Sequence, residues 1–235
     1  MTETPPAAIS GDALATVAGY SALAGLCPLI PIPFVDDFII ERIHRRLCWV
    51  LFNQHGSQLS DAGAKALSNS PSNLFGGVFR TLIFWPIKKL ITKLVYVLAV
   101  KSCADVASTV FNEGWLLARA LEQKYVPVDL DVAALESLRT AIIKAREAVD
   151  PSPTQAAMRS AFGVGQEVFS ATLSSVRKVL KGAAKDDRLD AAEQEVAPIA
   201  HRIQAEILKH WNSGPQLDAE LKKALNISDA RPIAP

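Results

Sequence analysis

Apolar residues recur every three or four positions along most of this chain, the spacing that gathers them on one face of an α-helix. The alternation of apolar and polar residues that marks a half-buried strand is nearly absent. Three stripes in the C-terminal half follow the helical spacing most plainly: Leu135, Leu138, Ile142, Ala145 and Val149; Met158, Phe162, Phe169, Leu173, Val176 and Leu180; and Val196, Ile199, Ile203, Ile207 and Trp211. Because such stripes bury themselves against one another, the sequence predicts an all-α multi-helix bundle with long antiparallel helices in its C-terminal half.

Helix start and stop signals divide this pattern into predicted segments. They cover residues 11–26, 36–54, 60–68, 74–85, 87–124, 131–149, 154–184, 187–212 and 215–225. The pattern allows a break near Lys101, and Gly163-Val164-Gly165 indicates a kink or a close helix contact. Val126-Pro127-Val128 separates an apolar, basic N-terminal half (1–126) from a C-terminal bundle (127–235), which we expect to pack as one unit.

The longest uncharged stretch, Ala13–Val35, has 23 residues, enough for a membrane-spanning helix. Pro28, Pro31 and Pro33 lie within it, and proline removes a backbone donor and drives the preceding residue toward extended geometry. We therefore expect a buried helix that ends near Leu26, followed by an extended proline-rich corner. A re-entrant hairpin that dips into a membrane is the alternative interpretation.

Cysteine usage and the first residues bear on the compartment. Cys27, Cys48 and Cys103 are odd in number and widely spaced, which predicts buried small hydrophobic residues and no disulfide framework. Residues 1–10 contain Glu3 but no lysine or arginine, so we expect no secretory signal and a reducing, cytoplasmic location. The formal net charge of +1 excludes nucleic-acid binding through bulk charge.

Positive charge is concentrated in the N-terminal half. Residues 38–101 hold nine basic and two acidic side chains, a local net charge of +7. Within them, the predicted helix over 87–98 is amphipathic. One arc of about 140° carries Lys88, Lys89, Thr92, Lys93 and Tyr96. The opposite face carries Leu90, Ile91, Leu94, Val95 and Leu98.

A basic amphipathic helix next to aromatic residues can lie in a membrane interface, with its apolar face among acyl chains and its lysines at anionic headgroups. The same pattern also fits a core helix with a solvated basic face. On the first interpretation, the membrane-contact candidates are Phe84, Trp85, Lys88, Lys89, Leu90, Lys93 and Leu94.

The sequence contains little that indicates a metal site or an enzyme active site. Asp37, Glu41 and His44 share one helical face, and Glu-x-x-His is half of a di-iron carboxylate site. The other histidines lack a glutamate three residues earlier, so we expect Glu41 to pair with Arg45 and His44 to serve as a packing or surface residue. The sequence contains no phosphate-binding glycine loop, no nucleophile elbow and no zinc-protease motif, and we expect no enzyme activity, metal or cofactor.

One run of residues carries a family resemblance. The corner Ile30-Pro31-Ile32-Pro33-Phe34-Val35-Asp36 leads into a helix with Arg45-Arg46, and Phe75-Gly76-Gly77 and a small-residue helix over 99–107 follow. This order resembles the YcjF-like and EcsC-like families of bacterial helical proteins over about residues 25–120. The resemblance implies a membrane-associated protein, in some members linked to small GTPases, and it implies no catalytic residue.

These observations predict a non-enzymatic helical protein that docks peripherally on the cytoplasmic face of a bacterial membrane through helix 87–98. Its partner would be anionic membrane lipid, with no nucleic acid. Two alternatives remain: a soluble adaptor that binds a partner protein such as a GTPase, and a helical pocket for a lipid or other apolar ligand.

Overall fold

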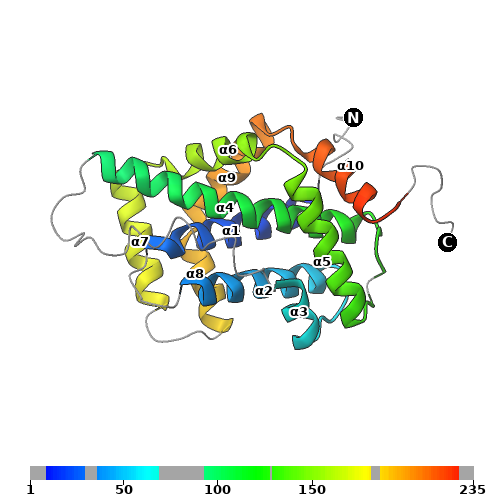
Figure 1. The fold of residues 1–235 in the computed structure, drawn as a ribbon. Helices are drawn as coiled ribbons and strands as arrows, with labels where there is room; N and C mark the ends of the chain where they lie inside the picture. Colours follow the sequence, from blue (N-terminus) through cyan, green and yellow to red (C-terminus); the bar gives the residue numbers. More distant parts are fainter. Residues whose placement is uncertain (1–8, 30–35, 69–92, 128, 181–185, 228–235) are drawn as a thin grey trace.

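The computed structural model describes residues 9–29, 36–68, 93–127, 129–180 and 186–227, and every regular element within these ranges is helical. The elements are α1 (Gly11–Leu26), the 3-10 helix η1 (Cys27–Leu29), α2 (Asp36–Gln54), α3 (Asp61–Ser68), α4 (Lys93–Glu122), α5 (Val132–Glu147), α6 (Ser152–Phe162), α7 (Gln166–Leu180), α8 (Asp186–Glu195), α9 (Ala197–His210) and α10 (Gly214–Ala224) (Figure 1). The predicted all-α multi-helix bundle is therefore confirmed.

Helix α1 lies at the centre of the bundle and packs against α2, α4, α8 and α9 (Figure 1). It is apolar on all sides, as expected of a helix with neighbours all around it. Its approach to α4 requires a glycine, because a Cβ atom at Gly25 would lie 2.8 Å from the carbonyl oxygen of Cys103 and 2.6 Å from the ring of Phe162. Gly25 thus allows α1 to lie close to the backbone of α4.

Among the described residues, one helix is long and apolar enough to cross a membrane: Gly11–Leu29, which joins α1 and η1. In this structure 72% of its most apolar window is buried inside the protein. The helix ends at Leu26, as predicted, while the proline-rich corner over 30–35 lies outside the described residues. All three cysteines are buried and none of them forms a disulfide in the described part of the chain, which confirms their predicted role as small hydrophobic residues.

The predicted single helix over 154–184 is wrong. Helix α6 ends at Phe162 and α7 begins at Gln166, because Gly163 and Gly165 intervene and Gly165 adopts a positive φ of 95°. The glycine pair therefore ends one helix and starts another, a stronger effect than the expected kink.

The predicted helix over 187–212 is also two helices. Helix α8 ends at Glu195 and α9 begins at Ala197, with Pro198 in the first turn of α9, where its missing N–H is not needed. Helix α4, by contrast, is continuous through Lys101, so the break that the sequence allowed there does not occur. The predicted helix over 74–85 and the start of the one over 87–124 lie outside the described residues.

Helices of both predicted halves contribute to one continuous buried cluster. Helix α4 packs against α6, α1 against α9, and α3 against α5. A polar chain joins the halves as well: the indole N–H of Trp211 donates to Thr154 at 2.9 Å, and the Thr154 hydroxyl donates to Asn112 of α4 at 3.0 Å. The edge of the Trp211 ring also meets Trp115.

Candidate functional site

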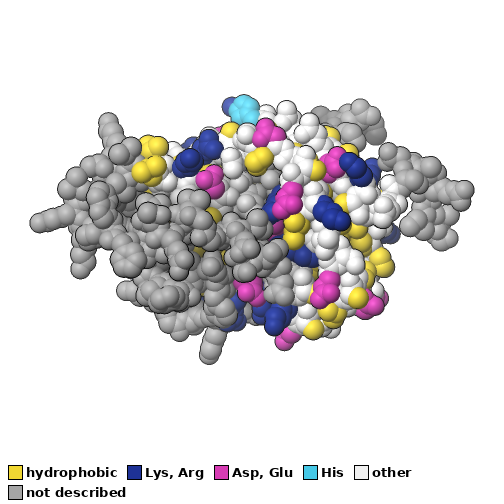
Figure 2. All heavy atoms as spheres, viewed as in Figure 1, with side chains coloured by type: hydrophobic (Ala, Val, Ile, Leu, Met, Phe, Trp, Pro, Cys, Tyr) yellow, Lys and Arg dark blue, Asp and Glu magenta, His cyan; other side chains and the backbone are white. Residues whose placement is uncertain are grey.

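The start of α4 carries exposed apolar side chains. Val97 is 60% exposed and Leu98 is 46% exposed, in the second turn of the helix. Lys101, one turn further on, is also exposed. Since positions three and four residues apart share a helix face, Val97, Leu98 and Lys101 form one outward surface, called here the α4 ridge. Figure 2 shows hydrophobic and basic side chains beside each other at the edge of the described surface where α4 begins.

The contacts of Tyr96 determine which side of this part of α4 faces the bundle. Its ring meets Phe169 of α7 edge to face with the centroids 5.5 Å apart, and its hydroxyl donates to the carbonyl oxygen of Phe162 at 3.4 Å. The expected placement of Tyr96 on a solvated arc is therefore wrong, because the ring packs on the bundle. Leu98, placed by the sequence on the opposite apolar face, is the residue that faces outward.

Five of the seven predicted membrane-contact residues lie outside the described residues: Phe84, Trp85, Lys88, Lys89 and Leu90. Lys93 and Leu94 belong to the first turn of α4, but their side chains are not among those described. The α4 ridge therefore adjoins the predicted contact segment in sequence, and it contains Val97, which the sequence analysis did not single out.

The N-terminus of α7 lies beside the α4 ridge through the Tyr96–Phe169 contact (Figure 1). It presents another exposed aliphatic residue, Val168, immediately before Phe169. This end of the molecule thus combines aliphatic surface from two helices that are 70 residues apart in the chain.

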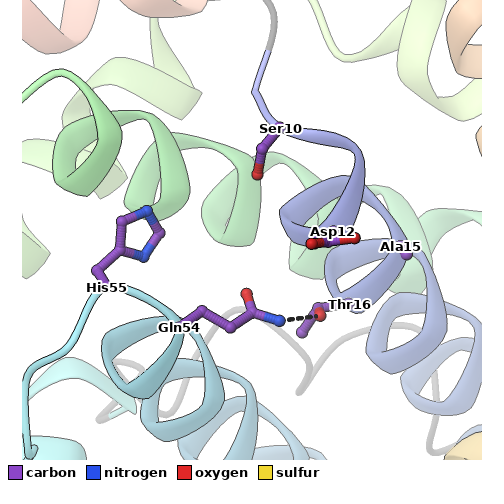
Figure 3. A pocket seen from close by; sticks show the side chains of 6 residues that line it. All are labelled: Ser10, Asp12, Ala15, Thr16, Gln54 and His55. Carbon is purple, nitrogen blue, oxygen red and sulfur yellow. Dashed lines mark hydrogen bonds between the residues drawn. The ribbon is translucent and has the colours of Figure 1, made fainter.

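A polar hollow of about 440 Å³ lies between the start of α1 and the end of α2 (Figure 3). Its lining consists of Ser10, Asp12, Ala15, Thr16, Gln54 and His55. Gln54 Nε2 donates to Thr16 Oγ1 at 2.8 Å, and His55 Nδ1 donates to the carbonyl oxygen of Leu51 at 2.7 Å. The polar lining does not fit an apolar ligand, so this hollow lends no support to the lipid-pocket alternative.

The most strongly buried charges meet between α2, α4 and α5. Glu113 of α4 accepts from Arg139 Nη1 at 2.6 Å and from Arg146 Nη1 at 2.5 Å, and His44 Nε2 lies 3.2 Å from the same carboxylate. Glu113 is only 4% exposed. Each carboxylate oxygen therefore has a cationic donor, which is the condition for burying such a charge.

The surroundings of this cluster keep Glu113 ionised and His44 neutral at neutral pH. Burial alone would raise the pKa of Glu113, but the positive charges of Arg139 and Arg146 hold it below its usual value. Burial lowers the pKa of His44 to about 4, and the attraction of Glu113 offsets this only in part. Burial also raises the pKa of the nearby Cys48 thiol to about 12, so this thiol remains protonated and unreactive at neutral pH.

Two of the three possible ligands on one face of α2, Glu41 and His44, have other partners in the structure, and the Asp37 side chain is not among those described. Arg45 Nη2 donates to Glu41 at 2.7 Å, which confirms the predicted pair one turn apart. His44 is a buried packing residue that faces Glu113, and no group of three or more possible metal ligands occurs among the described residues.

A second carboxylate cluster lies where α8 meets α1 and α2. Asp190 accepts from Arg46 Nε at 2.9 Å and Nη2 at 2.6 Å, and from the Tyr20 hydroxyl at 2.8 Å. The guanidinium of Arg46 also lies 4.3 Å from the ring centre of Trp49. We call Asp190, Arg46 and Tyr20 the α8 latch, because they join α8 to two other helices.

Sequence reasoning did not find either carboxylate cluster. In the sequence, Glu113 is one of several charges that interrupt an apolar stretch, and Arg139 follows the stripe residue Leu138. A charge inside an apolar helical stripe is the available signal, but it does not identify its partner. No known protein family, curated protein or solved structure matches this chain.

Proposed function

We propose that this protein is a non-enzymatic helical protein that docks peripherally on an anionic membrane surface through residues 84–98 and the α4 ridge. The observation that carries the proposal is the exposure of Val97 and Leu98. They follow residues 84–94, a sequence segment with three lysines and two aromatic residues. Aliphatic surface next to lysine is the combination that binds a membrane interface.

The expected energies of the two contributions are comparable. Each lysine close to an anionic membrane contributes about 1 kcal/mol. Complete burial of one aliphatic side chain contributes about 1.5–3 kcal/mol. Neither contribution alone holds a protein on a membrane at low concentration, whereas Lys88, Lys89 and Lys93 acting together with Val97 and Leu98 would suffice.

Vesicle flotation tests the proposal. The full chain should float with vesicles of phosphatidylcholine and phosphatidylglycerol, should float less as salt concentration rises, and should stay at the bottom with phosphatidylcholine alone. Changing Lys88, Lys89 and Lys93 together to Glu should weaken binding by at least about 100-fold, the factor that three lost lysine contributions of about 1 kcal/mol represent.

The apolar contribution has a matched control. Val97→Asp with Leu98→Asp should reduce flotation, because an acidic residue opposes both acyl burial and the surface potential. Leu208→Asp changes an equally aliphatic and more exposed residue on α9, and it should leave flotation unchanged. Absence of flotation at every lipid composition would overturn membrane docking, and a soluble adaptor that binds a partner protein would then be the better hypothesis.

A further inference from the structure

Helices α7 and α8 form a hairpin at the edge of the bundle, next to the α4 ridge (Figure 1). Helix α7 packs chiefly against α8, while α8 continues onto α1, α2 and α9. The hairpin begins after Gly163-Val164-Gly165 and ends at Val196, two points where regular helix is interrupted. Such interruptions are where backbone rotation moves a pair of helices as one body.

The hairpin covers part of α1. Leu189 and Ala192 of α8 are buried in the common core. The Glu193 side chain lies directly on Gly19 of α1, since a Cβ atom there would be 1.9 Å from Glu193 Oε1. Because Ala13–Val35 has no charged residue, the part of α1 beneath α8 carries no charge.

The described polar contacts between the hairpin and the other helices include the α8 latch, which is partly exposed, and a hydrogen bond of 2.6 Å from Arg177 Nη2 to the carbonyl oxygen of Leu29. A ring contact joins Phe169 of α7 to Tyr96 of α4. Asp190 is 39% exposed, so water and anions can compete for the Arg46 guanidinium. Glu193 lies half-buried on an apolar helix, a position that disfavours its charge and raises its pKa.

We propose that the α7–α8 hairpin is a hinged flap that opens at an anionic membrane and lets the α1 surface around Gly19 and Tyr20 contact acyl chains. This inference rests on the proposed docking function and concerns its regulation. Phospholipid headgroups would draw Arg46 away from Asp190, because both phosphate and carboxylate accept two hydrogen bonds from a guanidinium. Tyr96 joins the flap to the α4 ridge, so docking of the ridge and opening of the flap occur at the same end of the molecule.

A disulfide across the flap tests this proposal. In the double variant Gly19→Cys, Glu193→Cys, the new Cβ at position 19 would lie 3.1 Å from the present position of Glu193 Cγ. The two Cβ atoms are therefore at most one C–C bond farther apart than this, a separation compatible with the range of about 3.5–4.5 Å that a disulfide needs. The oxidised protein has a locked flap, and the reduced protein of identical sequence is its control. Peptide mapping identifies the new bond, and circular dichroism verifies that both forms fold.

Flotation with phosphatidylcholine and phosphatidylglycerol vesicles then decides the outcome. We expect the oxidised form to bind about tenfold more weakly than the reduced form. Equal binding of the two forms would overturn the flap while leaving membrane docking intact. Failure of both forms and of the unmodified chain to float would overturn docking and the flap together.

A single substitution tests the flap independently of the double cysteine variant. Asp190→Asn removes the charge that holds Arg46 and should strengthen vesicle binding by about threefold, because less free energy is needed to open the flap. Binding that stays unchanged or becomes weaker in Asp190→Asn would also overturn the flap. The single variant Glu193→Cys, without a partner thiol on α1, shows the effect of the side-chain change alone.

Discussion

Glu113 and Asp190, two of the carboxylates that join helices in this bundle, do so in contrasting ways. Glu113 joins α2, α4 and α5 from the interior, and Asp190 joins α1, α2 and α8 from the edge. Each accepts two guanidinium hydrogen bonds, Glu113 from two arginines and Asp190 from Arg46 alone. They differ in burial, since Glu113 is 4% exposed and the Asp190 side chain is 39% exposed.

Because of this difference in burial, breaking the contacts of Glu113 costs more free energy than breaking those of Asp190. When Glu113 loses a partner, no water can replace it, and an unpaired charge remains inside the protein. When Asp190 loses Arg46, solvent hydrates both groups, and the free energy of separation is small. We therefore assign the inner helices α1, α2, α4 and α5 to a rigid frame and the α7–α8 hairpin to a movable part.

The largest expected effect is that of Glu113→Gln. The substitution keeps the shape of the side chain but leaves Arg139 and Arg146 without a buried counter-charge, so it should lower the free energy of unfolding by about 3–5 kcal/mol. Urea denaturation at neutral pH, followed by circular dichroism, measures the change. A loss below about 1 kcal/mol would show that the contacts of Glu113 contribute no more to stability than a surface ion pair does. It would contradict the difference between Glu113 and Asp190.

Acidification should also act on the inner cluster. Because the pKa of His44 is lowered from 6.5 to about 4, the unfolded chain binds a proton between these values that the folded protein does not bind. Stability should therefore fall as pH decreases through this window, in total by on the order of 3 kcal/mol. The lowered pKa of Glu113 adds a further loss in the same direction below its usual value of 4.5.

Denaturation at a series of pH values checks this expectation. The variant His44→Gln should flatten the slope between pH 6.5 and 4, because the group that takes up the proton only on unfolding is gone. A slope that is unchanged in His44→Gln would place the pH dependence elsewhere in the molecule.

The smallest expected effect on stability is that of Asp190→Asn, the same chemical change made at the edge. It should lower the free energy of unfolding by less than about 1 kcal/mol, because the pair that it breaks is partly hydrated already. Hydrogen exchange should nevertheless become faster in α7 and α8 while the protection of α4 and α5 is kept. Faster exchange throughout the bundle would contradict a separately moving hairpin.

Sequence periodicity predicted the helices that have simple ends. Helix α1 matches its predicted range 11–26, and α2 matches 36–54, since Pro28 follows α1, Asp36 and Asp37 open α2, and Gly56 follows its end with a positive φ of 75°. The interrupted helices were predicted less well. Apolar stripes run through Gly163–Gly165 and through Pro198 without a change of spacing, so periodicity alone joined α6 to α7 and α8 to α9.

The candidate site was predicted only in its outline. Helical spacing identified an amphipathic segment at the start of α4, but it placed Leu98 on the apolar face, whereas Leu98 is 46% exposed and the Tyr96 ring packs on Phe169. A tyrosine can face solvent or pack with its ring buried and its hydroxyl bonded, and the choice depends on whether a partner such as Phe169 is present. Phe169 is 73 residues away in the chain, so no local pattern around Tyr96 indicates the contact.

The sequence by itself determined that this chain forms helices, where most of them begin and end, and that positive charge gathers ahead of α4. These are local properties, fixed by side-chain spacing, capping residues and proline. The tertiary structure alone decided that Glu113 is shared by two arginines from α5, that Asp190 joins α8 to α1, and which side of α4 faces outward. Each of these depends on contacts between residues far apart in the chain, and burial, which sets their energies, exists only once the helices have packed.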